Sequence, residues 1–277
     1  MRKRRLTLAV AVALAALTAL GIPLAAMAMK LPSRPQKKAA PVELTAPSWQ
    51  SGQYWADFDH RLLVDFADLA HFRAADERLG PPAAGTDRVV FVGDSITEGW
   101  KLQKSFPGKP YVNRGISGQT TSQILLRFRQ DVIDLHPRVV VILAGANDLA
   151  GNTGPVRLPQ VEGNLESMAQ LGRANGIAVV LCSLLPTVHY WWHPQVPNPA
   201  ARIRALNRWL EAYAGKHHYV YVNYYAAMKT ASGALKHTLS PDGVHPSAAG
   251  YAVMAPLAQA GIDQALTKEQ GGRTARR

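Results

Sequence analysis

The sequence predicts an α/β fold in which a mostly parallel sheet lies between two layers of helices. Short apolar runs alternate with helical patterns five times along the chain. Several of these runs are β-branched and show no polar alternation, which is typical of strands buried on both faces. The 277 residues are 47% hydrophobic and contain no internal repeat, so one large core is expected.

The expected strands and helices follow one another in a regular order. The strands are residues 88–92, 111–113, 138–144, 177–182 and 219–222. The helices, in which apolar residues recur at helical spacing, are residues 121–134, 159–175, 200–216 and 247–266. This alternation predicts a three-layer sandwich that binds its ligands at the carboxyl ends of the strands.

Three further segments flank this core. Residues 53–85 carry apolar side chains at helical spacing and are interpreted as an N-terminal helical extension of a domain that ends at residue 266. Residues 29–52 are rich in Pro, Lys, Ala and Ser, which indicates a linker. Residues 267–277 are expected to form a disordered basic tail.

The N-terminal segment, residues 1–28, is typical of a targeting sequence. Residues 2–5 are basic, no charge follows until Lys30, and Ala26-Met27-Ala28 has the small-x-small form of a cleavage site. The alternative is an uncleaved anchor, because residues 6–28 are long enough to span a bilayer. Both interpretations predict export to the periplasm or the outside of the cell, and the second adds a membrane tether.

The net charge of +12 lies mostly at the two ends of the chain. Residues 1–40 hold eight Lys or Arg and no acidic residue, and residues 266–277 carry a charge of +3. The domain between them is nearly neutral, so no basic face for nucleic acid is expected. Arg127 and Arg129 fall in a helical pattern and are interpreted as part of a solvated helix face.

A serine follows the first expected strand, in Gly93-Asp94-Ser95. A nucleophilic serine needs such a place, at a tight turn and at the amino end of a helix that favours developing negative charge. The tripeptide is also common in ordinary turns, where Asp and Ser cap the next helix. It therefore indicates a nucleophile only if a base is also present.

Asp242 and His245, just before the last expected helix, could supply that base and the acid that orients it. A serine hydroxyl is a poor nucleophile without a base, and the base needs an orienting acid. With two residues between them in a turn, the aspartate can reach one imidazole nitrogen and leave the other for Ser95. The alternative is an Asp-Gly turn followed by a surface histidine.

Gly118 and Asn147 are the candidate donors to an oxyanion. Gly118 lies in a loop after the second expected strand, where glycine lets a backbone N–H approach a ligand closely. Asn147 follows the third expected strand and can donate from its side-chain amide. Either segment could instead be an ordinary turn, since glycine and asparagine are enriched there.

Together, the four segments resemble the sequence blocks of the SGNH (GDSL-type) hydrolase family, which is named for Ser, Gly, Asn and His. The matching residues, in family order, are Ser95, Gly118, Asn147, Asp242 and His245. The resemblance covers roughly residues 88–260, and Ile96 stands where the family name has leucine.

The resemblance implies a flavodoxin-like five-stranded sheet and acyl transfer through an acyl-serine, with no metal or cofactor. In this scheme Ser95 is the nucleophile, His245 moves the proton and Asp242 orients His245. The Ser95 and Gly118 N–H groups and the Asn147 amide together hold the oxyanion.

Residues 186–199 follow the fourth expected strand and should lie at the same edge as this site. The side chains of interest there are His189, Tyr190, Trp191 and Trp192. They could wall a substrate pocket, because aromatic faces pack against acyl chains and sugar rings, or fold onto their own core. The spacing of His189 and His193 suggests a metal pair, but the surrounding prolines disfavour a helix and no cysteine or acid lies nearby, so no metal is expected.

The implied activity is hydrolysis of a small-molecule, lipid or glycan ester. The alternatives are a carbohydrate O-deacetylase of the same family and a non-catalytic domain that binds glycan or lipid. Loss of a triad residue would be the signature of the non-catalytic domain, and none is lost here. Nothing in the sequence selects among lysophospholipid, short-chain, aryl and sugar esters. Export favours lipid or glycan esters over cytoplasmic thioesters.

Overall fold

The computed structural model describes residues 52–274, which belong to one compact unit. The expected targeting segment and all but the last residue of the expected linker lie outside the described residues. Within the part that is described, no helix is both long and apolar enough to cross a membrane.

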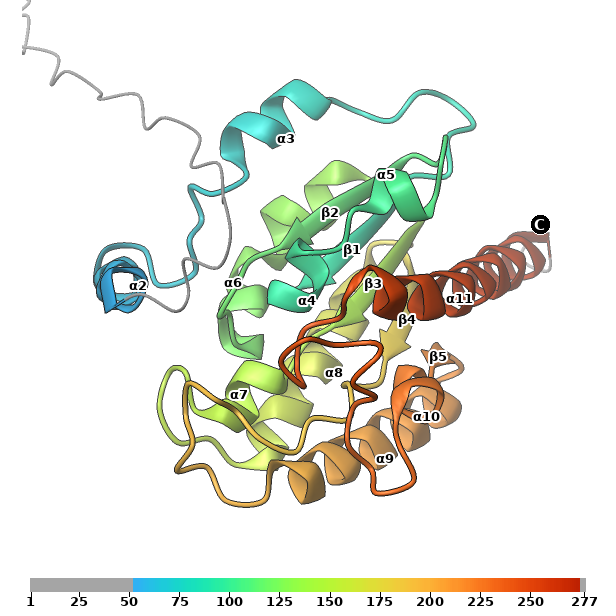
Figure 1. Cartoon of the computed structure of the whole chain (residues 1–277). Helices are drawn as coiled ribbons and strands as arrows, with labels where there is room; N and C mark the ends of the chain where they lie inside the picture. Colours follow the sequence, from blue (N-terminus) through green and yellow to red (C-terminus); the bar gives the residue numbers. More distant parts are fainter. Residues whose placement is uncertain (1–51, 275–277) are drawn as a thin grey trace, which may run out of the picture. The chain divides into compact units, whose positions relative to one another are not determined.

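Five strands form a single sheet in which every neighbouring pair is parallel (Figure 1). The strands are β1 (Val89–Gly93), β2 (Tyr111–Gly115), β3 (Val139–Leu143), β4 (Ala178–Cys182) and β5 (Val220–Val222). Their order is β2-β1-β3-β4-β5, the flavodoxin-like order. The predicted α/β class and the five expected strands are confirmed, and the sheet is entirely rather than mostly parallel.

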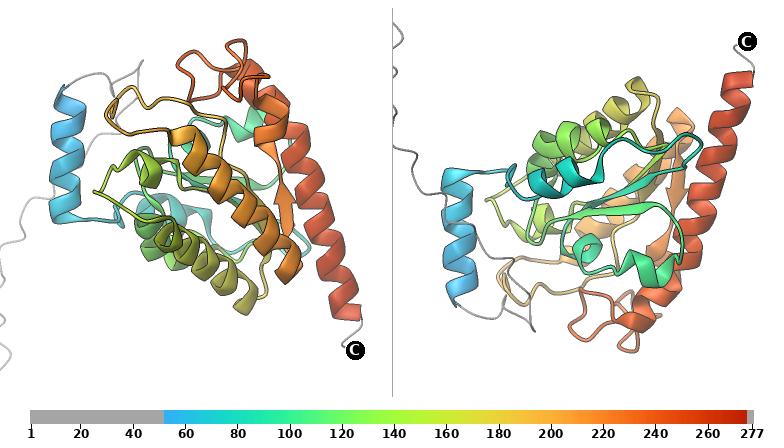
Figure 2. Two further views of the ribbon diagram at one scale, coloured as in Figure 1. Left: turned by 90° about the horizontal axis from the view of Figure 1, so that it is seen from below. Right: turned by 90° about the horizontal axis from the view of Figure 1, so that it is seen from above.

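Helices cover both faces of this sheet, as the views in Figure 2 show. On one face lie α6 (Thr121–Asp131), α8 (Leu158–Ala174) and α9 (Pro199–His217). On the other lie α5 (Leu102–Ser105), α10 (Tyr224–Met228) and α11 (Ala248–Thr274). Two short helices, α4 (Ser95–Glu98) and α7 (Ala146–Ala150), follow β1 and β3 almost directly.

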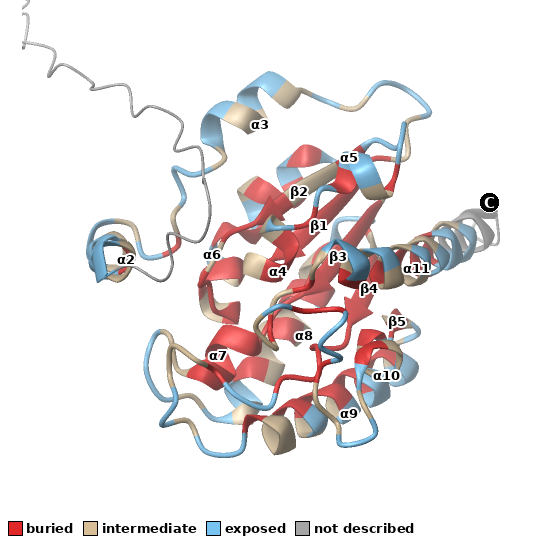
Figure 3. Cartoon of the chain, in the orientation of Figure 1, coloured by how far each residue is buried: buried red, intermediate tan, exposed pale blue. Residues whose placement is uncertain are grey.

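The strands separate two hydrophobic cores. Every residue of β1 and β3 is buried, which explains why these runs show no polar alternation (Figure 3). Successive side chains point to opposite faces. Val90 and Val140 therefore pack with the α6, α8 and α9 side, whereas Phe91 and Val141 pack with the α11 side.

The expected helical extension contains α2 (Gly52–Val64) and α3 (Arg73–Leu79), separated by turns. Asp68 adopts a φ of 52° and the Asp65 carboxylate accepts from the Ala70 N–H, so the chain leaves the helical path here. The apolar spacing that continued through Leu63 and Phe66 does not produce a buried face, because both side chains are exposed.

The last helix corrects one expectation. α11 continues to Thr274, so residues 267–274 are helical and not the disordered tail that was expected from residue 267. Lys, Glu and Gln at positions 268–270 are good helix formers, and a helix that is already anchored by packing gains one hydrogen bond for each residue added. The basic charge of residues 267–277 therefore did not indicate where this helix ends.

Candidate active site

Ser95 is the first residue of α4, a short helix that begins where β1 ends. Asp94 caps this helix, because its side chain accepts from the Ile96 N–H at 3.0 Å. The Tyr251 hydroxyl of α11 donates to the Ile96 carbonyl at 2.8 Å. Asp94 thus caps the helix as it would in an ordinary turn. Together with the Tyr251 bond, this cap holds the serine at the carboxyl edge of the sheet.

Two glycines let α4 lie this close to the sheet. A Cβ on Gly93 would lie 2.3 Å from both Thr97 Oγ1 of α4 and the Leu143 carbonyl oxygen of β3, and one on Gly115 would lie 2.1 Å from the Glu98 nitrogen. Both distances are far inside van der Waals contact. Any side chain at either position would therefore push α4, and Ser95 with it, away from the strands.

Ser95, His245 and Asp242 form a hydrogen-bonded row. The Ser95 Oγ lies 2.9 Å from His245 Nε2, and His245 Nδ1 lies 2.7 Å from Asp242 Oδ2. The other carboxylate oxygen accepts from the backbone N–H groups of Val244 and His245 at 2.9 and 2.8 Å. One turn therefore holds both the carboxylate and the imidazole, as the spacing of two intervening residues predicted.

The Asp242 carboxylate stays ionised in this setting. Burial raises its pKa, but the hydrogen bond and charge of His245 and two backbone N–H donors outweigh burial and bring the pKa well below its usual range. An ionised carboxylate accepts from Nδ1–H, which leaves Nε2 as an acceptor for the serine hydroxyl.

Gly118 lies in the loop after β2, and Asn147 is the second residue of α7, which is hydrogen-bonded to that loop. Gly118 adopts a φ of +80°, which favours glycine, and both residues are buried. The Asn147 amide donates to the Gln119 carbonyl at 3.0 Å. A side-chain amide has two N–H donors, so this bond leaves one of them for a ligand.

In the aromatic loop, residues 186–199, one side chain fits the interpretation of a loop folded onto its own core, and another fits that of a wall beside the site. Tyr190 is 1% exposed and packs in the core, whereas Trp192 lies beside His245 with 6.4 Å between ring centroids. The Trp192 indole donates to Asn152, whose own amide donates to the Gly118 carbonyl.

Trp191 packs edge-on against Trp192, with 5.1 Å between ring centroids. Trp191 is half-buried and His189 is exposed. Among residues 52–274, no three His, Cys, Asp or Glu side chains gather as a metal ion would need.

Helix α2 reaches the site, which the sequence analysis missed. Phe58 is the buried residue of α2, and its ring occupies the space that a Cβ on Gly118 would need, at 2.8 Å. Trp55 packs edge-on against Phe58 and also against His193 of the aromatic loop. Figure 2 shows α2 standing beside this loop. No local signal identified this contact, because its two partners, Phe58 and Gly118, are far apart in the sequence.

Arg127 also differs from expectation. It was interpreted as part of a solvated helix face, yet its side chain is 0% exposed and pairs with Asp131 at 2.9 Å. Arg127 and Asp131 are four residues apart and share the inward face of α6 with Ile124 and Phe128. That spacing was the signal that could have identified the buried pair. Arg129, on the other face, is exposed as expected.

Comparison with known proteins identifies the family of this chain. The model of the GDSL-like Lipase/Acylhydrolase family matches residues 91–253. The chain belongs to this family. Residues 52–90, which include α2 and α3, precede the part that matches the family model.

Relatives of this GDSL family member are known from sequence and from structure. Esterase TesA of Pseudomonas aeruginosa is 32% identical over 182 residues, covering 60% of this chain and 83% of that protein. An uncharacterized lipoprotein of Bacillus subtilis, YqeF, is 31% identical over 128 residues, covering 39% of this chain and 53% of that protein.

The crystal structures of a GDSL-like lipase of Bacteroides thetaiotaomicron and a putative acylhydrolase of Bacteroides fragilis are 42% and 41% identical to this chain. Each has a TM-score of 0.71 and matches 73% of this chain, covering 100% and 99% of the two chains respectively. The fold and the general class, an esterase or acylhydrolase, are therefore shared.

Proposed function

We propose that the protein is a serine esterase that cleaves carboxylic esters through an acyl-serine intermediate. The observation that carries this proposal is the row from Ser95 through His245 to Asp242, with hydrogen-bond distances of 2.9 and 2.7 Å. A hydroxyl, an imidazole and an ionised carboxylate in this order are the parts of a catalytic triad.

The reaction follows from the role of each group. His245 Nε2 takes the Ser95 proton as Oγ attacks the ester carbonyl, and the imidazolium is stabilised by Asp242. The protonated imidazole then gives the proton to the leaving alkoxide. Water, activated by the same imidazole, attacks the acyl-serine and releases the acid. No step requires a metal or cofactor.

The tetrahedral intermediates carry a negative oxygen that needs donors. We assign these to the backbone N–H groups of Ser95 and Gly118 and to the Asn147 amide. All three lie in buried loops or at a helix start, where such donors are worth more than in water. Trp192, beside His245, is proposed to face the departing alcohol.

The substrate class is proposed more broadly, as a small-molecule, lipid or glycan ester. Among these, sugar acetates would make the protein an O-deacetylase by the same chemistry. The name of the YqeF relative, a lipoprotein, supports export of this domain together with residues 1–28. An exported enzyme meets lipid and glycan esters more readily than cytoplasmic thioesters.

The nucleophile is tested by Ser95→Ala. We expect kcat on p-nitrophenyl esters to fall on the order of 10⁴-fold or more, and labelling by a fluorophosphonate to disappear, with little change in melting temperature. Ser167→Ala, a half-buried serine on α8 that bonds within its own helix, is the matched control and should behave as wild type. Labelling that persists in Ser95→Ala would refute the assignment.

A further inference from the structure

Gln119 joins the loop that carries Gly118 to α7, which carries Asn147, and these are two of the proposed oxyanion donors. It follows Gly118 directly in the chain, and its carbonyl accepts from the Asn147 amide at 3.0 Å. The residue is 2% exposed. A displacement of Gln119 would therefore move the Gly118 N–H and the Asn147 amide together.

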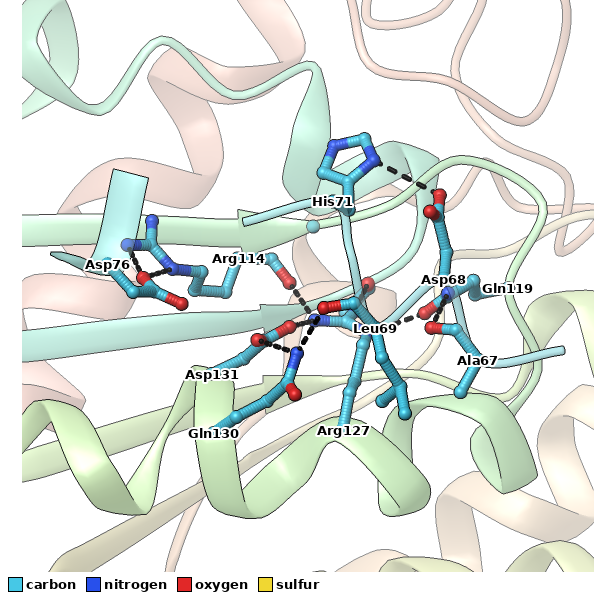
Figure 4. Close-up of polar contacts among 12 residues, drawn as sticks. Ala67, Asp68, Leu69, His71, Asp76, Arg114, Gln119, Arg127, Gln130 and Asp131 are labelled. Carbon is cyan, nitrogen blue, oxygen red and sulfur yellow. Dashed lines mark hydrogen bonds and ion pairs between the residues drawn. The ribbon is translucent and has the colours of Figure 1, made fainter. Parts of the chain in front are cut away.

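Both ends of the Gln119 side chain are held (Figure 4). Its Oε1 accepts from Arg127 Nε at 2.6 Å, and its Nε2 donates to the Ala67 carbonyl at 2.9 Å. The orientation of the amide is fixed by its partners, because a guanidinium can only donate and a carbonyl can only accept. The second bond joins the oxyanion loop to the turn between α2 and α3.

Arg127 connects Gln119 to the sheet. One of its terminal nitrogens donates to the Arg114 carbonyl at 2.9 Å, and the other donates to the Gly93 carbonyl at 3.0 Å. Gly93 ends β1 and is separated from Ser95 by Asp94 alone. The guanidinium thus bonds to the strand end that carries the nucleophile and to the residue that carries the oxyanion loop.

Burying the Arg127 guanidinium costs desolvation free energy, so neighbouring groups must compensate for it. Burial lowers the pKa of Arg127, and the adjacent Asp131 carboxylate opposes that effect. The guanidinium donates to Asp131, to Gln119 and to two backbone carbonyls. The side chain therefore acts on the site through the residues that it holds.

We propose that Gln119, clamped by Arg127, is a positioning residue that sets the oxyanion donors at their working distance from Ser95. The inference rests on the proposed esterase function and goes beyond it, because both side chains act through the loop and not through the substrate. Releasing the clamp lets residues 115–120 shift relative to α4. Such a shift weakens binding of the transition state and leaves binding of the neutral ester nearly unchanged.

The test measures kcat and KM separately for substitutions of Gln119. For Gln119→Leu and Gln119→Asn we expect kcat on p-nitrophenyl acetate to fall about 10- to 100-fold, with KM within about threefold of wild type. Asn147→Ala, which removes a donor, is the reference variant, and we expect it to lower kcat about 100- to 1000-fold. Leucine removes both hydrogen bonds, whereas asparagine keeps the amide but is too short to reach, so the second variant covers the case in which the first does not fold.

Two further variants separate positioning from general damage. Asn175→Ala removes a similar donor, from Asn175 Nδ2 to the Leu171 carbonyl at 2.8 Å, at the end of α8 that precedes β4, and should leave kcat unchanged. Gln119→Glu keeps an acceptor for Arg127, strengthens that bond by its charge and loses the donor to the Ala67 carbonyl. If the Arg127 bond is the one that holds the loop, we expect kcat within about fivefold of wild type. The rate of fluorophosphonate labelling should follow kcat through the series, since negative charge also develops on the phosphoryl oxygen in the oxyanion hole as Ser95 attacks and fluoride leaves.

Specific results would overturn the inference. Gln119→Leu or Gln119→Asn with wild-type kcat would show that the clamp does not position the donors. An equal loss in Gln119→Glu would exclude Arg127 as the group that holds the loop. A raised KM with normal kcat would indicate substrate contact instead. Failure of the proposed function looks different, because wild-type protein would then neither hydrolyse esters nor be labelled at Ser95.

Discussion

Asp94 is a completely buried carboxylate next to the nucleophile. Burial and, to a smaller extent, the nearby Asp148 raise its pKa to about 6, against the opposing effects of the Ile96 N–H and His245. Between its ordinary value of 3.8 and 6, the folded protein holds a proton on Asp94 that the unfolded chain has lost. Unfolding releases that proton, so stability decreases as pH rises through this window and stays reduced above it.

Asp94→Asn should remove this dependence. The amide oxygen still accepts from the Ile96 N–H, and no charge has to be buried at high pH. We expect the variant to exceed wild type by up to about 3 kcal/mol in unfolding free energy at pH 8, and by little at pH 4. Urea unfolding at both pH values measures the difference. Asp59→Asn, at an exposed carboxylate of α2, is the control. A difference that is equal at pH 4 and pH 8 would contradict the assignment.

At the scale of single residues, the sequence predicted the hydrogen-bonded row of Ser95, His245 and Asp242 and missed the buried pair of Gln119 and Arg127. Ser95, Asp242 and His245 could be found because their chemistry requires particular residue types at particular spacings. Gln119 and Arg127 act through contacts with Ala67 and Gly93, which lie 52 and 34 positions away in the chain. Glutamine and arginine side chains are most often solvated. Their residue types therefore indicated surface positions and not buried ones.

Helix α2 is attached to the domain by little buried apolar surface. The rest of α2 is exposed or half-buried, and Phe58 supplies its buried contact with Gly118. A segment with so little buried apolar surface opens locally at a lower free energy than the sheet. Apart from the carboxyl end of α11, the expected helices that pack on the sheet were found close to their predicted bounds, since burial imposes a clear apolar spacing.

Phe58→Ala should therefore release α2 without unfolding the domain. We expect trypsin to cleave after Arg61 at least about tenfold faster, because the loss of even about 1.4 kcal/mol of local stability raises the open population by that factor. The melting temperature of the sheet should change much less. Leu63→Ala, which alters a side chain that is 86% exposed on the same helix, should cleave at the wild-type rate. Equal cleavage in both variants would mean that Phe58 does not anchor α2.

For the whole molecule, the sequence predicted the sheet more completely than the position of the segments outside it. The parallel sheet follows from β-branched runs that are buried on both faces, a pattern that is local and strong. The docking of residues 52–69 depends on Phe58 and on three glutamines that reach the backbone carbonyls of Phe66, Ala67 and Leu69. A backbone carbonyl is present at every residue, so no spacing in the sequence marks the acceptor.

The role of residues 1–28 stays a prediction at the scale of the whole chain. If they are a cleaved targeting segment, the mature protein recovered from an exporting bacterial host should begin at Met29, after Ala26-Met27-Ala28. Mass spectrometry of the intact protein gives this directly. Recovery of the uncleaved chain in the membrane fraction would instead support the anchor.

The close fit of α4 against the strands limits how this protein could be re-engineered. A library randomised at Gly93 or Gly115 should return only glycine, since the first added carbon meets backbone atoms of Leu143 or Glu98. Residues 188–197 are mostly exposed or half-buried and carry no member of the Ser-His-Asp row. Selection for new esters can therefore vary this loop, apart from the buried Tyr190 and the hydrogen-bonded Trp192, while the turn that presents the serine stays invariant. The protein's capacity to acquire new substrates and its ability to perform the chemistry are encoded in different stretches of the gene.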